Sequence, residues 1–311
     1  MRESKRFDKR TTVLKSDEPR KKFFLFFEGE KTEMIYFDAV RQKKDEIGIN
    51  PLIELRQLVC GYSERTSNPK KMLENLLKTL DAHENGNITY RMLIDEMTEI
   101  YKEKFPNKSK KELFNMFWDI CDKKLLVNLE KKVESISKTS AFILDILKEE
   151  ISLKINLNCI TSIPEIEYED GFDRICMIVD RDKHSFNENQ YNEVVHDCKK
   201  NNIDFYITNP CFEFWLYMHF ETAGKLCSAD KKLISDNNRL NKKRTYIEDV
   251  LIKEFEKHNK KYNKNRYDAE WLLKSINTAI INEAKFCEDT EKLKDEIGSN
   301  IGMLIKELRE Q

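Results

Sequence analysis

Two short, uninterrupted runs of apolar residues, each ending at an acidic residue, are the clearest pattern in the chain. Residues 23–27 are followed at once by Glu28, and residues 175–179 by Asp180. Runs of this length without a polar position are typical of strands that are buried on both faces, as in a parallel sheet. A third strand is predicted over residues 203–208, and the segments between the runs carry helical spacing. The pattern therefore predicts an α/β fold with a small parallel sheet flanked by helices.

Helical spacing dominates the rest of the sequence. Thr89 is a candidate helix cap, and Ser109 with Glu112 forms a capping-box pattern. Residues 85–165 carry almost only helical spacing, which predicts a large helical insertion that projects from the core, and a closing helix is predicted over residues 290–310. The predicted organisation is a charged N-terminal arm (1–20), a discontinuous core (21–84 and 166–285), the helical insertion (85–165) and a C-terminal helix (286–311).

Charge and cysteine usage narrow the class of protein further. The chain has 55 Lys and Arg against 56 Asp and Glu, so any nucleic-acid surface must be a local patch rather than a consequence of net charge. The eight cysteines are scattered without a C-x-x-C pair, which argues against a zinc site and against a disulfide framework. No signal peptide is recognisable, and the longest apolar runs are far shorter than a membrane span. We expect a cytoplasmic protein with reduced thiols and no membrane partner.

The acidic ends of the two apolar runs are candidates for metal ligation. Glu28 is followed by Gly29, which permits a sharp turn and a close ligand at the end of the strand. Asp180 and Asp182 form an extended D-x-D, whose carboxylates suit Mg²⁺ or Mn²⁺. Because open α/β sheets bind ligands at the carboxyl ends of their strands, we expect these three acids to converge on one site. Each motif alone also has a structural explanation, since acids are common at helix starts and D-x-D is frequent on surfaces.

A third motif follows the strand predicted at residues 203–208. Glu213 lies in the first turn of the helix that begins after Asn209 and Pro210, and it is a further candidate ligand for the same metal. A helix-start acid without a ligand explains Glu213 equally well. The aromatic residues around it are expected to be core, and His219 is interpreted as a hydrogen-bonded core or rim histidine.

Taken together, the three motifs resemble those of the RloB-like proteins. They are E-G-E-K-T-E-x-x-Y-F at residues 28–37, V-D-R-D-x-H at residues 179–184, and N-P-C-F-E-x-W-L-x-x-H-F at residues 209–220. The resemblance covers roughly residues 21–80 and 170–285. It is closest to the abortive-infection branch of the family, represented by the second component of the AbiL system.

This resemblance implies a Toprim-like fold and a nuclease that acts in defence against phage. Matched residue by residue, Glu28 takes the Toprim glutamate position, and Asp180 and Asp182 take the D-x-D. Family members are typically encoded beside an ATPase, so the resemblance implies a partner of that kind and a nucleic-acid substrate. It does not account for the helical block, which is a candidate for partner binding or for homodimer formation.

The resulting hypothesis is metal-dependent hydrolysis of a phosphodiester bond. The three carboxylates at the strand ends, with Glu213 as a further ligand, would bind one or two Mg²⁺ or Mn²⁺ ions. Contacts to the substrate phosphate are predicted for Lys31, His184 and Lys264, the last within a basic run at residues 258–266. Each of these three positions also has an explanation without a ligand: the lysines can be solvated surface residues, and the histidine can be a turn residue.

Two other functions stay open from the sequence. In one, the chain is a non-catalytic, Toprim-like scaffold for a neighbouring ATPase, although all three acids are intact. In the other, it is a metal-dependent nucleotidyl- or glycosyltransferase that uses the D-x-D, although no donor-binding loop is evident. Nothing in the sequence separates DNA from RNA or tRNA as the substrate.

Overall fold

A computed structural model describes residues 20–28, 31–57, 68–102, 105, 107–150, 169, 171–183, 185–241 and 244–310. Contacts divide the chain into two compact units, one made of residues 1–57 and 169–311 and the other of residues 58–168. The predicted charged arm, residues 1–20, lies outside the described residues apart from Arg20.

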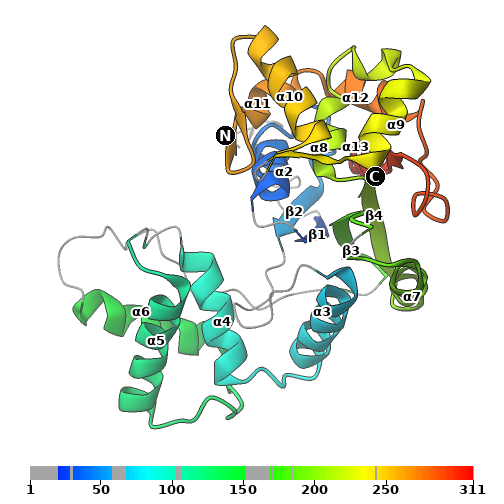
Figure 1. The fold of residues 1–311 in the computed structure, drawn as a ribbon. Coiled ribbons are helices and arrows are strands. Elements are labelled where there is room, and N and C mark those ends of the chain that lie inside the picture. Colours follow the sequence, from blue (N-terminus) through cyan, green and yellow to red (C-terminus); the bar gives the residue numbers. More distant parts are fainter. Residues whose placement is uncertain are drawn as a thin grey trace, which may run out of the picture. The chain divides into compact units, whose positions relative to one another are not determined.

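A five-stranded sheet forms the core of the first unit (Figure 1). Its order is β2-β1-β3-β4-β9, in which the first four strands are parallel and β9 is antiparallel to β4. The strands are β1 (Lys21–Phe27), β2 (Ile53–Gln57), β3 (Arg174–Asp180), β4 (Ile203–Asn209) and β9 (Gly298–Ser299). The two apolar runs are β1 and β3, which take interior positions because both of their faces need cover. The predicted α/β fold with a small, mostly parallel sheet flanked by helices is confirmed.

Helices cover both faces of this sheet. They are α2 (Thr32–Gln42), α7 (Glu188–Lys200), α8 (Phe212–Tyr217), α9 (Ser228–Asp236), α10 (Tyr246–Lys257), α11 (Ala269–Leu273), α12 (Ile276–Glu283) and α13 (Ile301–Glu310). On one face, Leu25 and Ile178 share a core with Tyr36 of α2 and with residues of α8 and α10 to α13. On the other face lies α7, whose Tyr191 ring is 6.0 Å from the ring of Phe205 in β4.

Two small hairpins sit beside the helices of the first unit. They are β5 (Arg239–Asn241) with β6 (Arg244–Thr245), and β7 (Tyr262–Asn263) with β8 (Arg266–Tyr267). The first hairpin connects α9 to α10, and the second connects α10 to α11. Both therefore belong to the segment that follows β4, the strand next to β3.

The end of the chain differs from the predicted helix over residues 290–310. Residues 290–297 form turns and bends, Gly298 and Ser299 form the edge strand β9, and the helix begins only at Ile301. Gly298 and Ser299 pair with β4 and run close to the backbone of Cys287, since a Cβ at Gly298 would lie 1.9 Å from the Cys287 carbonyl oxygen. A two-residue strand carries no periodic signal, so the hydrophobic pattern does not predict it.

We expect Gly298→Ala to destabilise the first unit. The added methyl group collides with the Cys287 backbone, which cannot turn aside as a flexible side chain would. Overpacking of this kind costs about 2 kcal/mol. Urea denaturation followed by tryptophan fluorescence would measure the loss, and an unchanged midpoint would show that the backbone adjusts without cost.

The described part of the second unit consists of helices and their connections. These are α3 (Pro69–Glu84), α4 (Tyr90–Tyr101), α5 (Lys110–Ile120), a π-helix (Cys121–Leu125) and α6 (Ile136–Glu150). Thr89 caps α4 by accepting from the Met92 N–H at 3.4 Å, and Ser109 and Glu112 form the expected capping box. The contact division places α3 in this unit, whereas the boundary expected at residue 85 placed it in the core. Within the described residues, no helix is long and apolar enough to cross a membrane.

Candidate functional site

The carboxyl ends of β1 and β3 bring two of the predicted acids together. The two strands pair in parallel, with Phe27 opposite Ile178, so the residues that follow them meet at one edge of the sheet. The backbone N–H of Glu28 donates to the Ile178 carbonyl at 3.1 Å. The Glu28 side chain then accepts, through Oε2, the backbone N–H of Asp180 at 3.1 Å. Glu28 and Asp180 are therefore neighbours, although 152 residues separate them in the sequence.

The D-x-D segment directs its two aspartates and its arginine differently. Asp180 accepts the backbone N–H of Phe212, the first residue of α8, at 2.7 Å. Arg181 is buried, donates to the Lys294 and Phe186 carbonyls, and packs against Tyr191. Asp182 is exposed and accepts the Ser185 hydroxyl at 3.0 Å. Both aspartates line the same cavity.

A further acid, Glu33, joins the site without having been assigned a role from the sequence. It lies in the first turn of α2 and only 4% of its surface is exposed. Together with Asp180 and Glu213 it lines a cavity of about 300 Å³. The signal for it was present in the first motif, where it ends the E-G-E-K-T-E segment, but helix-start acids are too common to single it out.

Glu213 is brought to the site and is engaged there by a lysine. It is 2% exposed, and its Oε1 lies 3.0 Å from the Lys264 ammonium and accepts the Tyr262 hydroxyl at 3.3 Å. The same ammonium lies 2.5 Å from a carboxylate oxygen of Glu248 in α10. Lys264 stands in the turn between β7 and β8, so this hairpin supplies the positive charge that balances two buried acids.

Crowding of buried acids raises their affinity for protons. Burial, followed by the charges of Glu33 and Asp182, raises the pKa of Glu28 to about 8 against the opposing Asp180 N–H bond. Burial and the charge of Glu213 raise the pKa of Glu33 to about 7. The pKa of Asp180 is raised well above its ordinary value by burial and then by the charges of Glu33, Glu213 and Glu28. Positive charge at this place would relieve the repulsion and release protons.

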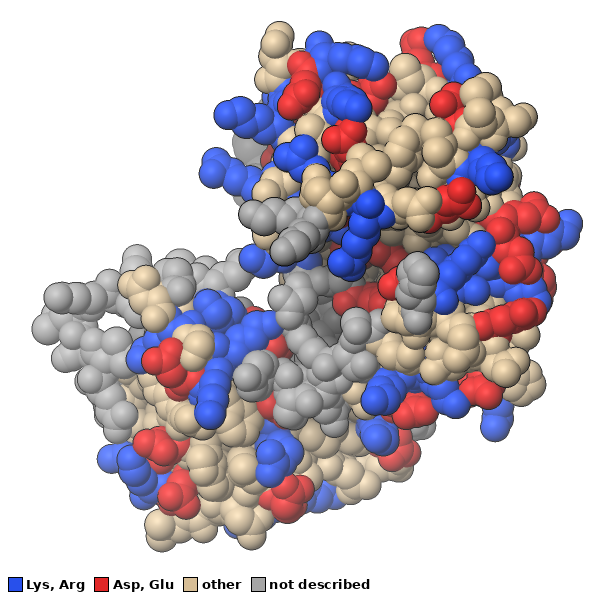
Figure 2. Space-filling model, viewed as in Figure 1, with Lys and Arg blue, Asp and Glu red and all other residues tan. Residues whose placement is uncertain are grey.

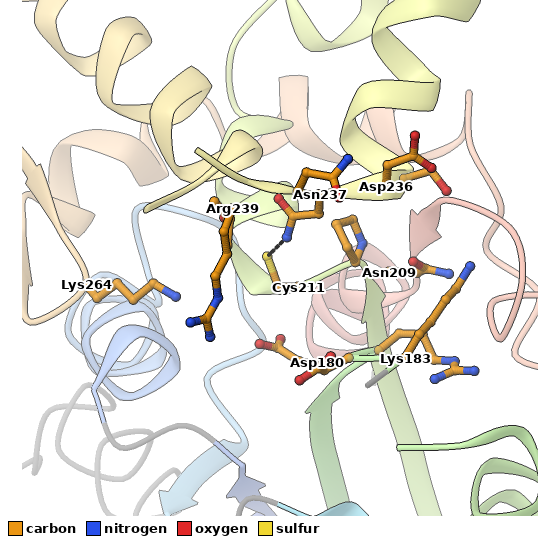
Figure 3. Close-up of a pocket in the computed structure, with 14 residues that line it drawn as sticks. Asp180, Lys183, Asn209, Cys211, Asp236, Asn237, Arg239 and Lys264 are labelled. Carbon is orange, nitrogen blue, oxygen red and sulfur yellow. Dashed lines mark hydrogen bonds between the residues drawn. The ribbon is translucent and has the colours of Figure 1, made fainter. Parts of the chain in front are cut away.

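Two cavities meet at Asp180. The larger, of about 580 Å³, runs from Asp180 and Asp182 to the end of α9 and the β5–β6 hairpin (Figure 3). The smaller is the one lined by Glu33 and Glu213. Asp180 and Lys264 line both. The carboxyl ends of the strands thus face open space, as ligand sites of open α/β sheets do.

The family model for RloB-like protein matches residues 23–308. This chain belongs to the RloB-like family. The match includes the ends of β1, β3 and β4, which carry the three motifs. No curated protein and no solved structure matches the chain.

The remaining predicted residues of this RloB-like protein have different surroundings. Lys31 is exposed and lines the smaller cavity, whereas His184 lies outside the described residues. His219 is a core residue, as interpreted from the sequence, because it is 3% exposed and bonds the Tyr36 hydroxyl and the Trp215 carbonyl. Burial lowers the pKa of His219 to about 4, which keeps its ring neutral.

The oxygen-rich donor set at the strand ends suits a hard divalent cation such as Mg²⁺ or Mn²⁺. In this conformation, no three His, Cys, Asp or Glu side chains of the described residues are arranged to hold a metal ion. Glu28 and Asp180 instead accept backbone N–H groups, and Asp182 accepts the Ser185 hydroxyl. The residue types and the raised pKa values of Glu28, Glu33 and Asp180 fit a cation.

Acidic and basic side chains are interspersed over the face of the molecule shown in Figure 2. This agrees with the formal net charge of −1. Contact with a polyanion must therefore depend on particular cations near the site rather than on the charge of the whole protein.

Proposed function

We propose that this RloB-like protein is a divalent-metal-dependent nuclease that hydrolyses phosphodiester bonds in DNA or RNA. One observation carries the proposal: Glu28 and Asp180 adjoin at the carboxyl ends of neighbouring parallel strands, and Asp180 and Asp182 open onto one cavity. Ligand sites of open α/β sheets occupy this position. A role as the effector of an anti-phage abortive-infection system, beside an ATPase partner, is proposed from the resemblance to the AbiL branch.

The proposed chemistry assigns a role to each acid. Glu28, Asp180 and Asp182 would hold Mg²⁺ or Mn²⁺, which supplies polarisation of a phosphoryl oxygen and a bound water of lowered pKa. Without a cation Glu28 holds a proton near neutral pH, because burial raises its pKa to about 8, and a bound metal ion would displace that proton. Glu213 was expected as a metal ligand, but here it pairs with Lys264. We assign Glu213 the task of holding that lysine beside the site.

The alternative function is a scaffold for the neighbouring ATPase without chemistry of its own. The crowding of Glu28, Glu33 and Asp180 argues against it. A scaffold has no need to bury three mutually repelling acids, which cost stability in the absence of a cation.

Incubation of the purified protein with plasmid DNA, single-stranded DNA and total RNA tests the proposal. Each substrate is given with Mg²⁺, with Mn²⁺ and with EDTA, in the presence and absence of the product of the neighbouring gene. We expect at least one substrate to be cleaved. This cleavage should require the metal and should stop when EDTA is added. Absence of cleavage in every combination, with the protein folded and its partner present, would favour the scaffold.

A further inference from the structure

The larger cavity beside the D-x-D is lined mainly by polar and charged residues, and its end at the β5–β6 hairpin has no assigned role. Asp180 and Asp182 form one end of it, and Asn237 and Arg239 form part of the other. No aromatic side chain of the described residues lines it. A ligand here would therefore be bound through charge and hydrogen bonds rather than by stacking of a base.

Four cations line this cavity, and within the described residues all but Arg239 have a hydrogen-bond or ion-pair partner. Arg181 and Lys183 donate to backbone carbonyls, and Lys264 is paired with Glu213 and Glu248. The side chain of Arg239 is exposed and has no partner within the described part of the chain. Figure 3 shows it extending from its hairpin toward Asp180.

Neighbouring contacts hold the backbone of Arg239 in place. Arg239 pairs with Thr245 across the β5–β6 hairpin. The preceding Asn237 is in the left-handed region (φ 39°) and ends α9. Its Oδ1 accepts the Ile247 N–H at 3.1 Å, and its Nδ2 donates to the Cys211 Sγ at 3.7 Å (Figure 3). Asn237 thus ties the hairpin to the segment after β4, which also borders Asp180.

We propose that the cavity binds a backbone phosphate of the nucleic-acid substrate adjacent to the scissile one, with the Arg239 guanidinium as its donor. The identity of the ligand as nucleic acid rests on the proposed function. A guanidinium presents a planar fork of N–H donors that matches two phosphate oxygens. Since phosphate contacts carry no base information, Arg239 would fix the register of the strand over the carboxylates independently of sequence.

Equilibrium binding tests this assignment without requiring cleavage. Short fluorescein-labelled single-stranded RNA and DNA are titrated with protein in a Glu28→Gln background, and anisotropy is recorded over a series of salt concentrations. We expect Arg239→Ala to weaken binding about tenfold or more, and to reduce the slope of log K against log salt by about one. Arg244→Ala is the matched control, because Arg244 lies on the same hairpin, pairs with Asp249 and does not line the cavity. It should leave both quantities unchanged.

Thermal melts serve as the control that all variants are folded. The binding and cleavage results then distinguish failure of the subsite from failure of the proposed nuclease. Equal affinity and slope for Arg239→Ala and its parent would overturn the subsite, as would equal weakening by Arg244→Ala or no binding by the parent. A selective loss in Arg239→Ala, with no metal-dependent cleavage by the wild type, would leave the subsite standing and remove the nuclease. Metal-dependent cleavage by the wild type, with unaltered binding by Arg239→Ala, would support the nuclease and overturn the subsite.

Discussion

Asp180→Ala should abolish metal-dependent cleavage while leaving the protein folded. Removal of a proposed metal ligand should lower the rate at least about a hundredfold, because even outer partners of metal ligands cost about 10- to 100-fold. The matched control is Asp122→Asn, which changes an exposed aspartate of the π-helix. Initial rates on whichever substrate the wild type cleaves would measure the effect. Residual activity in proportion to the folded fraction of Asp180→Ala would contradict the catalytic assignment.

The stability of Asp180→Ala separates a metal-binding acid from an acid that holds the fold. Asp180 accepts one described hydrogen bond, from Phe212, and it is repelled by Glu28, Glu33 and Glu213. At pH 8, where Glu33 and part of the Glu28 population are ionised, its removal relieves that repulsion, so the metal-free melting temperature should equal or exceed that of the wild type. A satisfied structural carboxylate would instead cost about 1–3 kcal/mol when removed. Added Mg²⁺ should raise the melting temperature of the wild type and have much less effect on the variant.

The same acids set the sign of the pH dependence of the metal-free protein. The pKa of Glu28 is raised from 4.5 to about 8 and that of Glu33 from 4.5 to about 7. The folded state therefore binds protons more tightly than the unfolded state, and these two groups lower the free energy of unfolding as pH rises from 4.5 to 8. Asp180→Ala should flatten this fall, because it removes one of the repelling charges. Melts at pH 5 and pH 8 would measure the difference between the two proteins.

Lys264→Met should destabilise the first unit substantially. The substitution keeps the aliphatic stem but leaves Glu213 and Glu248 buried without their shared counter-charge. Removal of one partner from a buried pair costs about 3–5 kcal/mol, and the 53% exposure of the Lys264 side chain favours the lower end, about 3 kcal/mol. Urea denaturation at pH 7 would measure the loss.

A double variant tests the cause of that loss. Lys264→Met with Glu213→Gln should recover part of the stability, because the neutral amide no longer needs the ammonium. The loss in Lys264→Met should also shrink at acid pH, where carboxyl groups are protonated. If the single and double variants lose the same stability, Lys264 contributes through the packing of its aliphatic stem and not through its charge.

The sequence predicted those features that depend on local pattern. The apolar runs at residues 23–27 and 175–179 became the interior strands β1 and β3. Because interior parallel strands end at one edge, Glu28 and Asp180 could be expected to meet, and the structure places them in contact. The caps at Thr89 and Ser109 depend on side chains within one turn, which a sequence displays directly.

Features that depend on packing between distant elements were not predictable. The Lys264 pair with Glu213 and Glu248 requires the β7–β8 hairpin to fold over α8 and α10. The placement of Arg239 depends in the same way on the contact of Asn237 with Cys211. Neither contact has a periodic signal or a fixed spacing along the chain. The resemblance to a family indicated a class of function. The contacts and burial of the acids became known only from the structure.

Titration of Mn²⁺ into the metal-free protein, followed by loss of the free-ion EPR signal, tests most directly whether the strand-end carboxylates form a cation site. The account predicts that the wild type binds Mn²⁺, and that Asp180→Ala and Asp182→Asn each weaken this binding at least about tenfold. Asp122→Asn should bind as the wild type does. Equal Mn²⁺ affinity in the wild type and both site variants, or no binding by the wild type at millimolar Mn²⁺, would contradict it.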